Sequence, residues 1–102
     1  MRYHAIEYAE QPLFGLPVAV FDFETTGVNP QECRIVELSI VHLDLGKGNP
    51  KEVYSCRINP GIPIPEGASN VHGIYDRDVQ GCFTFKEVWP ELQEHLRGRV
   101  LA

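Results

Sequence analysis

The amino-acid sequence predicts a mixed α/β domain, in which a sheet of three consecutive strands is followed by helices. Three apolar segments between residues 17 and 58 are separated by clusters of Gly, Asn and Pro, which is the pattern of short strands joined by turns. Beyond residue 61 the apolar residues change to the three- and four-residue spacing of amphipathic helices. The length of 102 residues and the 43% hydrophobic content fit one globular domain.

The first strand is expected over residues 18–24. Residues 1–16 are expected to form a tail that docks onto the domain of residues 17–102. Pro17 opens the strand, a position that proline tolerates. Apolar residues on both faces predict a central strand that is covered on both sides. A Thr-Thr-Gly turn follows, in which we expect Gly27 to adopt a positive φ or to permit a close approach of backbone.

Two further strands complete the predicted sheet. Residues 34–45 are rich in Ile, Val and Leu and predict a second, longer strand. Residues 46–50 predict a turn, and residues 52–58 predict a third strand with Tyr54, Cys56 and Ile58 on one face. These three strands would form a β-meander.

Helices are predicted over residues 66–71, 76–79 and 85–96. Thr84 and Glu87 have the spacing of a capping box at the start of the last helix, and Gly98 is placed to end it. Pro90 should remove one hydrogen bond or bend this helix. Because Trp89 shares the apolar stripe of the helix, we expect it in the core and not as a platform for stacking bases.

Asp22 and Glu24, at the end of the first strand, carry the chemistry that the sequence suggests. Alternation along a strand places both carboxylates on one face, about 6.6 Å apart. Carboxylates at this spacing repel one another unless cations lie between them. The arrangement suits a pair of divalent metals that cleave a phosphodiester. An acidic pair in a polar turn can also have no function, so other motifs must decide.

Charge and cysteine content exclude several other classes. The net charge is −5 and the pI is about 5.2, so the sequence has no basic face that would coat nucleic acid. Bound metals could still supply positive charge for approaching phosphates. Cys33, Cys56 and Cys82 form no paired motif and predict three reduced, mostly buried thiols in a cytoplasmic protein. Neither a signal peptide nor a membrane span is predicted.

Two segments resemble motifs of the DEDD 3′–5′ exonucleases. The first is Phe21-Asp-Phe-Glu-Thr-Thr-Gly27, which is similar to their first acidic motif. The second combines Asn59-Pro60, two Ile-Pro dipeptides and Val71-His-Gly-Ile74, which resemble the segment after the meander in the DnaQ-like branch. That branch includes proofreading subunits of bacterial replicative DNA polymerases. The resemblance covers residues 17–102 and implies a ribonuclease H-like exonuclease fold, with a DNA polymerase subunit as a partner.

The resemblance implies that Asp22 and Glu24 bind two divalent cations, Mg²⁺ or Mn²⁺, during hydrolysis of the terminal phosphodiester. Glu37 also resembles a family position, and we expect it to have a structural role. The substrate implied is the 3′ end of a nucleic acid, single-stranded DNA rather than RNA. The Val-His-Gly-Ile segment favours the branch whose general base is histidine.

Five further positions match the part of the family that holds the 3′-terminal nucleotide. Thr25 and Thr26 match contacts to this nucleotide, although Thr26 could equally cap the turn. Val28 matches a position that packs against the terminal sugar or base. Val71 and His72 match residues that line the nucleotide pocket.

The sequence also departs from the family pattern. It contains no later motif with two further aspartates and a general base. We therefore expect weak cation binding, a first strand without its parallel neighbour, exposed apolar surface, and no appreciable activity of these residues alone. One alternative is an inactive exonuclease remnant that binds a polymerase or forms a homo-oligomer through its exposed edge. Another is a small structural domain in which the acidic pair is incidental.

Overall fold

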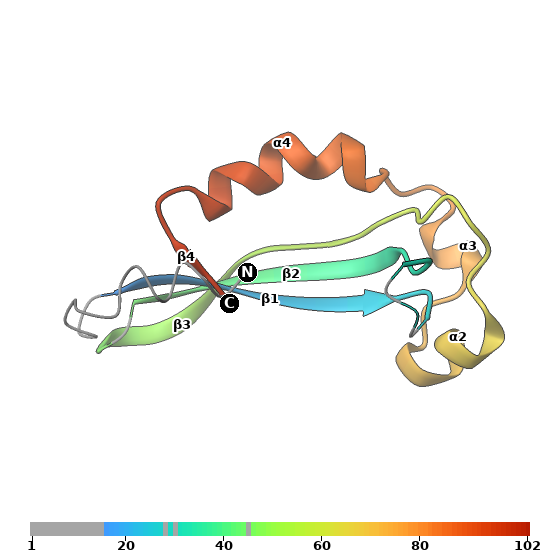
Figure 1. Cartoon of the computed structure of the whole chain (residues 1–102), viewed down its shortest axis with the longest axis horizontal. Helices are drawn as coiled ribbons and strands as arrows, with labels where there is room; N and C mark the ends of the chain where they lie inside the picture. The colour runs from blue at the N-terminus through green and yellow to red at the C-terminus, as the bar shows by residue number, and fades with distance from the viewer. Residues whose placement is uncertain (1–15, 28, 30, 45) are drawn as a thin grey trace.

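The computed structural model describes residues 16–27, 29, 31–44 and 46–102, and it contains a four-stranded mixed sheet (Figure 1). The strands lie in the order β3-β2-β1-β4, with antiparallel pairing except between β1 and β4. Their bounds are Pro17–Thr25 for β1, Ile35–Asp44 for β2, Lys47–Arg57 for β3 and Val100–Leu101 for β4. The predicted mixed α/β class is confirmed.

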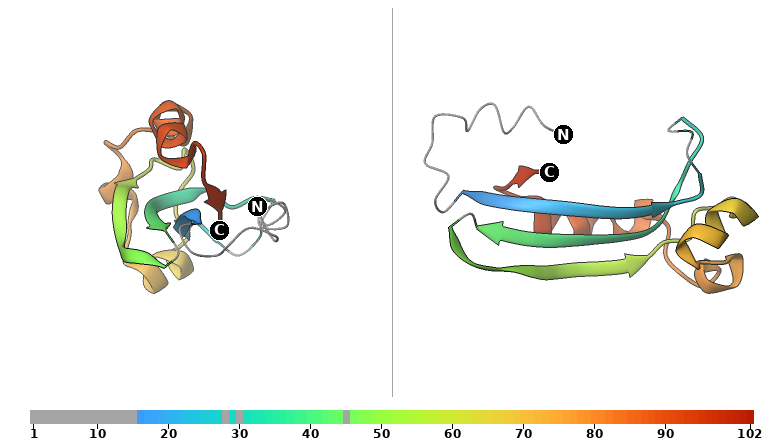
Figure 2. Two further views of the ribbon diagram at one scale, coloured as in Figure 1. Left: turned by 90° about the vertical axis from the view of Figure 1, so that its left-hand side faces the viewer. Right: turned by 90° about the horizontal axis from the view of Figure 1, so that it is seen from below.

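Three helices follow the meander: α2 (Glu66–His72), α3 (Asp76–Val79) and α4 (Phe85–Leu96). The positions predicted for all three are confirmed, with α2 one residue longer than expected. Helix α4 runs along one face of the sheet, while α2 and α3 lie together beyond the end at which β1 stops and β2 begins (Figures 1 and 2). The end of β1 therefore faces α2.

The register of β1 against β2 assigns each side chain to one of two faces. Asp22 lies opposite Ser39 and Glu24 opposite Glu37. Ala19 and Phe21, on the opposite face of β1, point toward α4, and the main core forms on that side between the sheet and the helix. Its buried members are Ala19, Leu38, Ile40, Ile58, Val88 and Leu92. The carboxylates consequently project from the face that α4 does not cover.

Strand β4 corrects the expectation that β1 has no parallel neighbour. Val18 pairs with Val100, and Ala19 pairs with Leu101. The backbone N–H of Phe21 donates to the carbonyl of Ala102 at 3.0 Å, and the N–H of Ala102 donates to the carbonyl of Ala19 at the same distance. A short apolar segment is enough to pair the backbone N–H and C=O groups along this part of β1, since a parallel ladder is formed by backbone groups alone.

The predicted turn over residues 46–50 is also wrong, because β3 already begins at Lys47. Gly46 has a φ of 79° and makes the tight turn. Pro50 is tolerated within β3 because β3 is the edge strand of the sheet, where one side of the strand needs no donors.

Trp89 is not in the core, contrary to expectation. Its side chain is 41% exposed, whereas Val88 and Leu92 are 5% and 2% exposed. Only the narrow face with Val88 and Leu92 meets the sheet, and Trp89 lies about 100° further around the helix. It packs beside Phe85, with the ring centroids 5.8 Å apart.

The remaining expectations concern the tail and the thiols. The proposed tail lies outside the described residues except for Leu16, which is buried with Val18 and Val100. The three cysteines are free but half-buried rather than mostly buried. None of the helices in the described ranges has the length and apolar character needed to span a membrane.

Candidate active site

The acidic pair lies at the carboxyl end of β1. Asp22 is exposed and Glu24 is half-buried, and both project from the face opposite α4. The β1–β2 pairing is irregular between Glu24 and Thr25, where the ladder shifts by one residue. Such a bulge bends the chain at the strand end. Neither carboxylate forms an ion pair with any residue that the structure describes.

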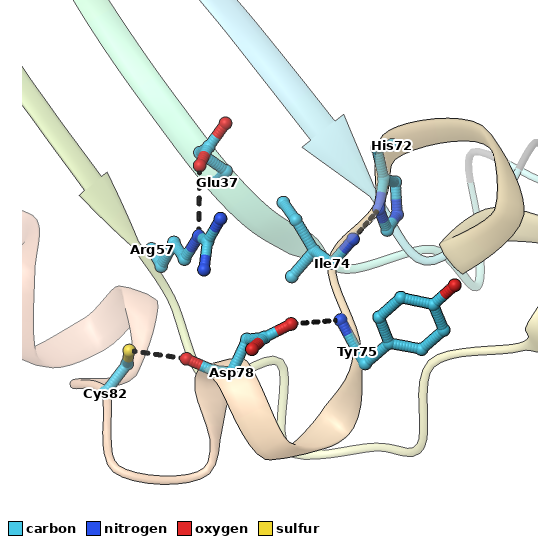
Figure 3. A network of polar contacts seen from close by, with 7 residues as sticks. All are labelled: Glu37, Arg57, His72, Ile74, Tyr75, Asp78 and Cys82. Carbon is cyan, nitrogen blue, oxygen red and sulfur yellow. Dashed lines mark hydrogen bonds and ion pairs between the residues drawn. The ribbon is translucent and has the colours of Figure 1, made fainter.

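A third carboxylate, Glu37, lies directly across from Glu24. Like charges at directly opposite positions destabilise a sheet. Arg57 of β3 offsets the third charge, since its Nε is 3.3 Å from a carboxylate oxygen of Glu37 (Figure 3). Both side chains are partly exposed, so this ion pair contributes at most about 1 kcal/mol. Glu37 thus has a partner within the sheet, which is in keeping with a structural role.

The turn after β1 is held by threonine hydroxyl groups. The hydroxyl of Thr25 donates to the carbonyl of Gly27 at 2.8 Å. Thr26 is 3% exposed. Its Oγ1 accepts from the N–H of Arg34 at 2.9 Å, and its own N–H donates to the carbonyl of Arg34 at 2.8 Å. Thr26 therefore joins the two strands across the turn, and its contact with the terminal nucleotide stays a prediction.

Gly27 behaves differently from the expectation. Its φ is not positive, and a Cβ added there would meet no atom of the residues that the structure describes within 4 Å. Neither backbone strain nor a close protein neighbour explains glycine at this position. Val28, the next predicted contact, lies outside the described residues.

His72, the last residue of α2, links that helix to the end of β1 through both ring nitrogens. Nδ1 accepts a hydrogen bond from the N–H of Ile74 at 3.0 Å (Figure 3). Nε2 lies 3.0 Å from the carbonyl oxygen of Thr25. Because a carbonyl can only accept, Nε2 must carry the proton and donate, which fixes the neutral Nε2–H tautomer. The ring nitrogens are used by the protein, so a ligand would meet the ring's face or edge.

These elements enclose an open pocket of about 420 Å³ between the end of β1 and α2. It gathers five of the predicted site residues: Glu24, Thr25, Thr26, Val71 and His72. Val71 is 84% exposed. Asp22 does not line the pocket but lies on the adjoining sheet face.

Phe23 also lines this pocket and is 42% exposed, although the sequence placed it among the apolar faces of a buried strand. Its place as the last aromatic residue before the polar turn is the one signal that could have identified it. Pro65, Gly67 and Ala68 complete the wall from the α2 side. Their small side chains leave room beside the ring of His72.

The donor chemistry of the acidic pair suits magnesium or manganese in kind, since both cations prefer carboxylate oxygen. The number of donors is small. Within the described part of the chain, no group of three or more His, Cys, Asp or Glu side chains could hold a metal ion. Asp22 and Glu24 would balance only half of the charge of two divalent cations.

Comparison with known proteins identifies the family. Residues 19–102 match the family model described as Exonuclease (RNase T). A DNA polymerase III subunit epsilon-like protein of Rhodobacter capsulatus is 37% identical over 94 residues, which cover 91% of this chain and 13% of that protein. A PolC-type DNA polymerase III of Pediococcus pentosaceus is 32% identical over 90 residues, which cover 88% of this chain and 6% of that protein. The chain therefore spans a small part of the length of either relative.

Solved structures agree with this assignment. Exonuclease X, solved in complex with 5′ overhanging duplex DNA, aligns with a TM-score of 0.61 and 29% identity over 74% of this chain and 42% of its own. Exonuclease I of Methylocaldum szegediense aligns with a TM-score of 0.69 over 84% of this chain and 20% of its own, and its 18% identity supports the fold alone. The ribonuclease H-like exonuclease fold is confirmed, and the chain belongs to the RNase T exonuclease family.

Proposed function

We propose that this chain carries the first acidic motif and the 3′-nucleotide pocket of a metal-dependent 3′–5′ exonuclease. The observation that carries the proposal is that Glu24 lines one pocket together with Thr25, Thr26, Val71 and His72. The names of the relatives support DNA rather than RNA as the substrate and a DNA polymerase as the partner. The DNA-bound form of exonuclease X supports a nucleic-acid ligand.

The chain's own residues would have distinct roles in this reaction. Asp22 and Glu24 would bind Mg²⁺ or Mn²⁺, and these cations, when bound, would activate a water molecule and stabilise the leaving 3′ oxygen. The exposed side chains of Phe23 and Val71 offer apolar contacts to a terminal base or sugar. His72 would hold the pocket in shape through its two hydrogen bonds.

The described residues would not complete the reaction by themselves. Two carboxylates neutralise two divalent cations poorly, so the cations would be held weakly. We therefore propose that a protein consisting of these residues alone releases no appreciable nucleotide, and that further ligands come from elsewhere in a longer protein or from a partner.

The test uses the gene product that contains this chain, with Mn²⁺ or Mg²⁺, and single-stranded DNA labelled at its 5′ end. Release of nucleotides from the 3′ end is measured as shortening of the labelled strand. Asp22→Asn and Glu24→Gln should each lower the rate at least about a hundredfold, equal to about 2.7 kcal/mol. Glu52→Gln, on the edge strand, is the matched control and should have no effect. If the original protein and the three variants released nucleotides at the same metal-dependent rate, Asp22 and Glu24 would not be the metal ligands.

The 102-residue chain should be assayed in parallel. Nucleotide release by this chain that disappears in Asp22→Ala would contradict its proposed inactivity and would indicate ligands supplied by a second copy. Binding of Mn²⁺, followed by electron paramagnetic resonance, gives a readout that does not need activity. We expect weak binding that Asp22→Asn weakens further.

A second candidate is an inactive exonuclease remnant that binds a polymerase subunit or another copy of itself. It is favoured because the described part of the chain has no group of three or more His, Cys, Asp or Glu side chains that could hold a metal ion. Light scattering over a range of concentrations would test self-association, and a monomer at every concentration would count against that form of the candidate.

A further inference from the structure

Two further hollows lie around the end of the sheet beyond the proposed nucleotide pocket, and neighbouring hollows share lining residues. A neighbouring hollow shares Thr26, Gly27 and Pro65 with that pocket. It in turn shares Cys33 with a third hollow of about 360 Å³, which lies between the start of β2 and the start of α4. We call this third hollow the α4 groove, and its lining residues used below are Arg34, Thr84, Phe85 and Lys86.

The α4 groove is basic although the chain is acidic. Arg34 and Lys86 line it, and no Asp or Glu among the described residues does, whereas the whole chain has a net charge of −5. The Nη1 of Arg34 donates to the carbonyls of Glu32 and Cys33 at 3.2 and 3.3 Å. A guanidinium has five N–H groups, so donors remain for an anion. Lys86 is exposed and forms no ion pair with any residue in the described ranges.

Exposed aromatic rings adjoin these cations. Phe85 lines the α4 groove and is 40% exposed. Trp89 lies one helical turn further along α4 and is 41% exposed, with its ring tilted by 33° against Phe85. Phe83, just before the helix, is 66% exposed. Exposed aromatic rings beside a basic groove are the combination that binds single-stranded nucleic acid without sequence preference.

We infer that the α4 groove binds the segment of single-stranded nucleic acid that precedes the 3′-terminal nucleotide. The inference rests on the proposed function, because that function places the 3′ end in the adjoining pocket. Arg34 and Lys86 would contact phosphates, and Phe85 with Trp89 would stack on bases. A peptide is less well matched, since the α4 groove offers two cations for repeated anionic groups. One hollow, which shares residues with both, lies between the α4 groove and the pocket for a strand end.

The test compares binding of a thymidine dinucleotide and a thymidine hexanucleotide to the chain in EDTA, which prevents hydrolysis. Trp89 is the one tryptophan of the chain, and its ring lies 5.8 Å from that of Phe85, which lines the α4 groove. The hexanucleotide should bind at least about tenfold more tightly than the dinucleotide because more bases stack. It should also quench the emission of Trp89, which the dinucleotide should leave unchanged.

Arg34→Gln combined with Lys86→Gln should remove the advantage of the hexanucleotide and leave dinucleotide binding unchanged. The dependence of log affinity on log salt should become shallower by about 1.4, at about 0.7 for each lost phosphate contact. The control pair Lys51→Gln with Arg77→Gln removes the same charge from exposed positions outside the α4 groove. It should keep the advantage of the longer strand.

Equal affinity for both oligonucleotides, unchanged Trp89 emission, or equal loss in the control pair would each overturn the inference. An unresponsive Trp89 would leave a peptide as the occupant of the α4 groove. Because these binding measurements need no cleavage, they can refute the inference about the α4 groove independently of the Asp22→Asn activity assay, which tests the proposed function. Oligonucleotide binding that persists while Asp22→Asn retains full activity would refute the proposed function and keep the α4 groove as a nucleic-acid site.

Discussion

The two hydrogen bonds of His72 connect α2 to the end of β1 and define the pocket between them. Both bonds are partly buried, and they use opposite sides of the ring. If one bond is lost, a carbonyl or an N–H is left without its partner, which costs more than the bond itself contributes. His72 therefore matters for stability even before any ligand is considered.

The two bonds can be separated by substitution. In His72→Asn the side-chain oxygen replaces Nδ1 and keeps the bond to Ile74, whereas in His72→Gln the amide nitrogen replaces Nε2 and keeps the bond to Thr25. We expect each variant to lower the free energy of unfolding by about 1 kcal/mol, and His72→Ala to lower it by about 2 kcal/mol. Urea unfolding measures these changes. An alanine variant as stable as the original would show that the linkage contributes nothing.

At single positions the sequence predicted the face on which a side chain lies better than its exposure. The shared face of Asp22 and Glu24 follows from strand alternation alone, and the structure places them so. Trp89 was expected in the core, and Phe23 belongs to a strand that was expected to be covered on both sides, but each is about two-fifths exposed. Exposure depends on how much of a strand or helix its neighbours cover, which a local pattern does not contain.

At the scale of secondary structure, the capping box at the start of α4 makes stability depend on pH. The carboxylate of Glu87 accepts hydrogen bonds from the N–H of Thr84 at 2.9 Å and from its hydroxyl at 3.0 Å. These bonds lower the pKa of Glu87 below its usual value of 4.5. Its contribution is therefore present above that value and is lost as the pH falls through the pKa of the folded state.

We expect NMR titration to show a pKa of Glu87 below 4.5 in the original chain and a value closer to 4.5 in Thr84→Ala. The stability difference between the original chain and Glu87→Gln should shrink as the pH falls below this value. A pKa of Glu87 at or above 4.5, or a stability difference that does not change with pH, would contradict the structural role of the carboxylate.

Pro90 lies in the middle of α4, where proline removes a hydrogen bond to the carbonyl four residues earlier. Pro90→Ala should restore that bond and raise the free energy of unfolding by about 1 to 3 kcal/mol. Pro50→Ala, in the edge strand, is the control and should change stability by less than about 0.5 kcal/mol. Lower stability of Pro90→Ala would instead show that a bend is needed to seat Val88 and Leu92 on the sheet.

The helices were predictable because their signals are local. The spacing of Thr84 and Glu87, the stripe of Val88 and Leu92, and the Gly after the last turn are all read within a few residues. The start of β3 was not predictable, since Gly48 and Pro50 are turn residues by composition. They are tolerated in a strand because β3 pairs with β2 along one side only, so its other side needs no backbone donors.

At the scale of the whole molecule, residues from opposite ends of the described chain pack together at the β1–β4 side of the sheet. Val100 is 4% exposed and packs on Leu16 and Val18. Arg99 of the same segment donates to the carbonyl of Val18 and to the carboxylate of Asp44, each at 3.2 Å. The sequence showed an apolar segment here but could not show its partner, because the pairing joins residues about eighty positions apart.

Substitutions of two valines, Val100 and Val71, can distinguish the stability provided by the β1–β4 pairing from the function of the pocket. Val100→Ala leaves a cavity among buried residues and should lower the free energy of unfolding by about 1 to 3 kcal/mol. Val71→Ala makes the same chemical change at an 84% exposed position and should alter stability by less than about 0.5 kcal/mol. Under the proposed function, Val71→Ala should instead weaken binding of a thymidine dinucleotide, measured by calorimetry in EDTA. If Val71→Ala destabilised the fold as much as Val100→Ala, Val71 would be a packing residue and its place in the nucleotide pocket would have to be abandoned.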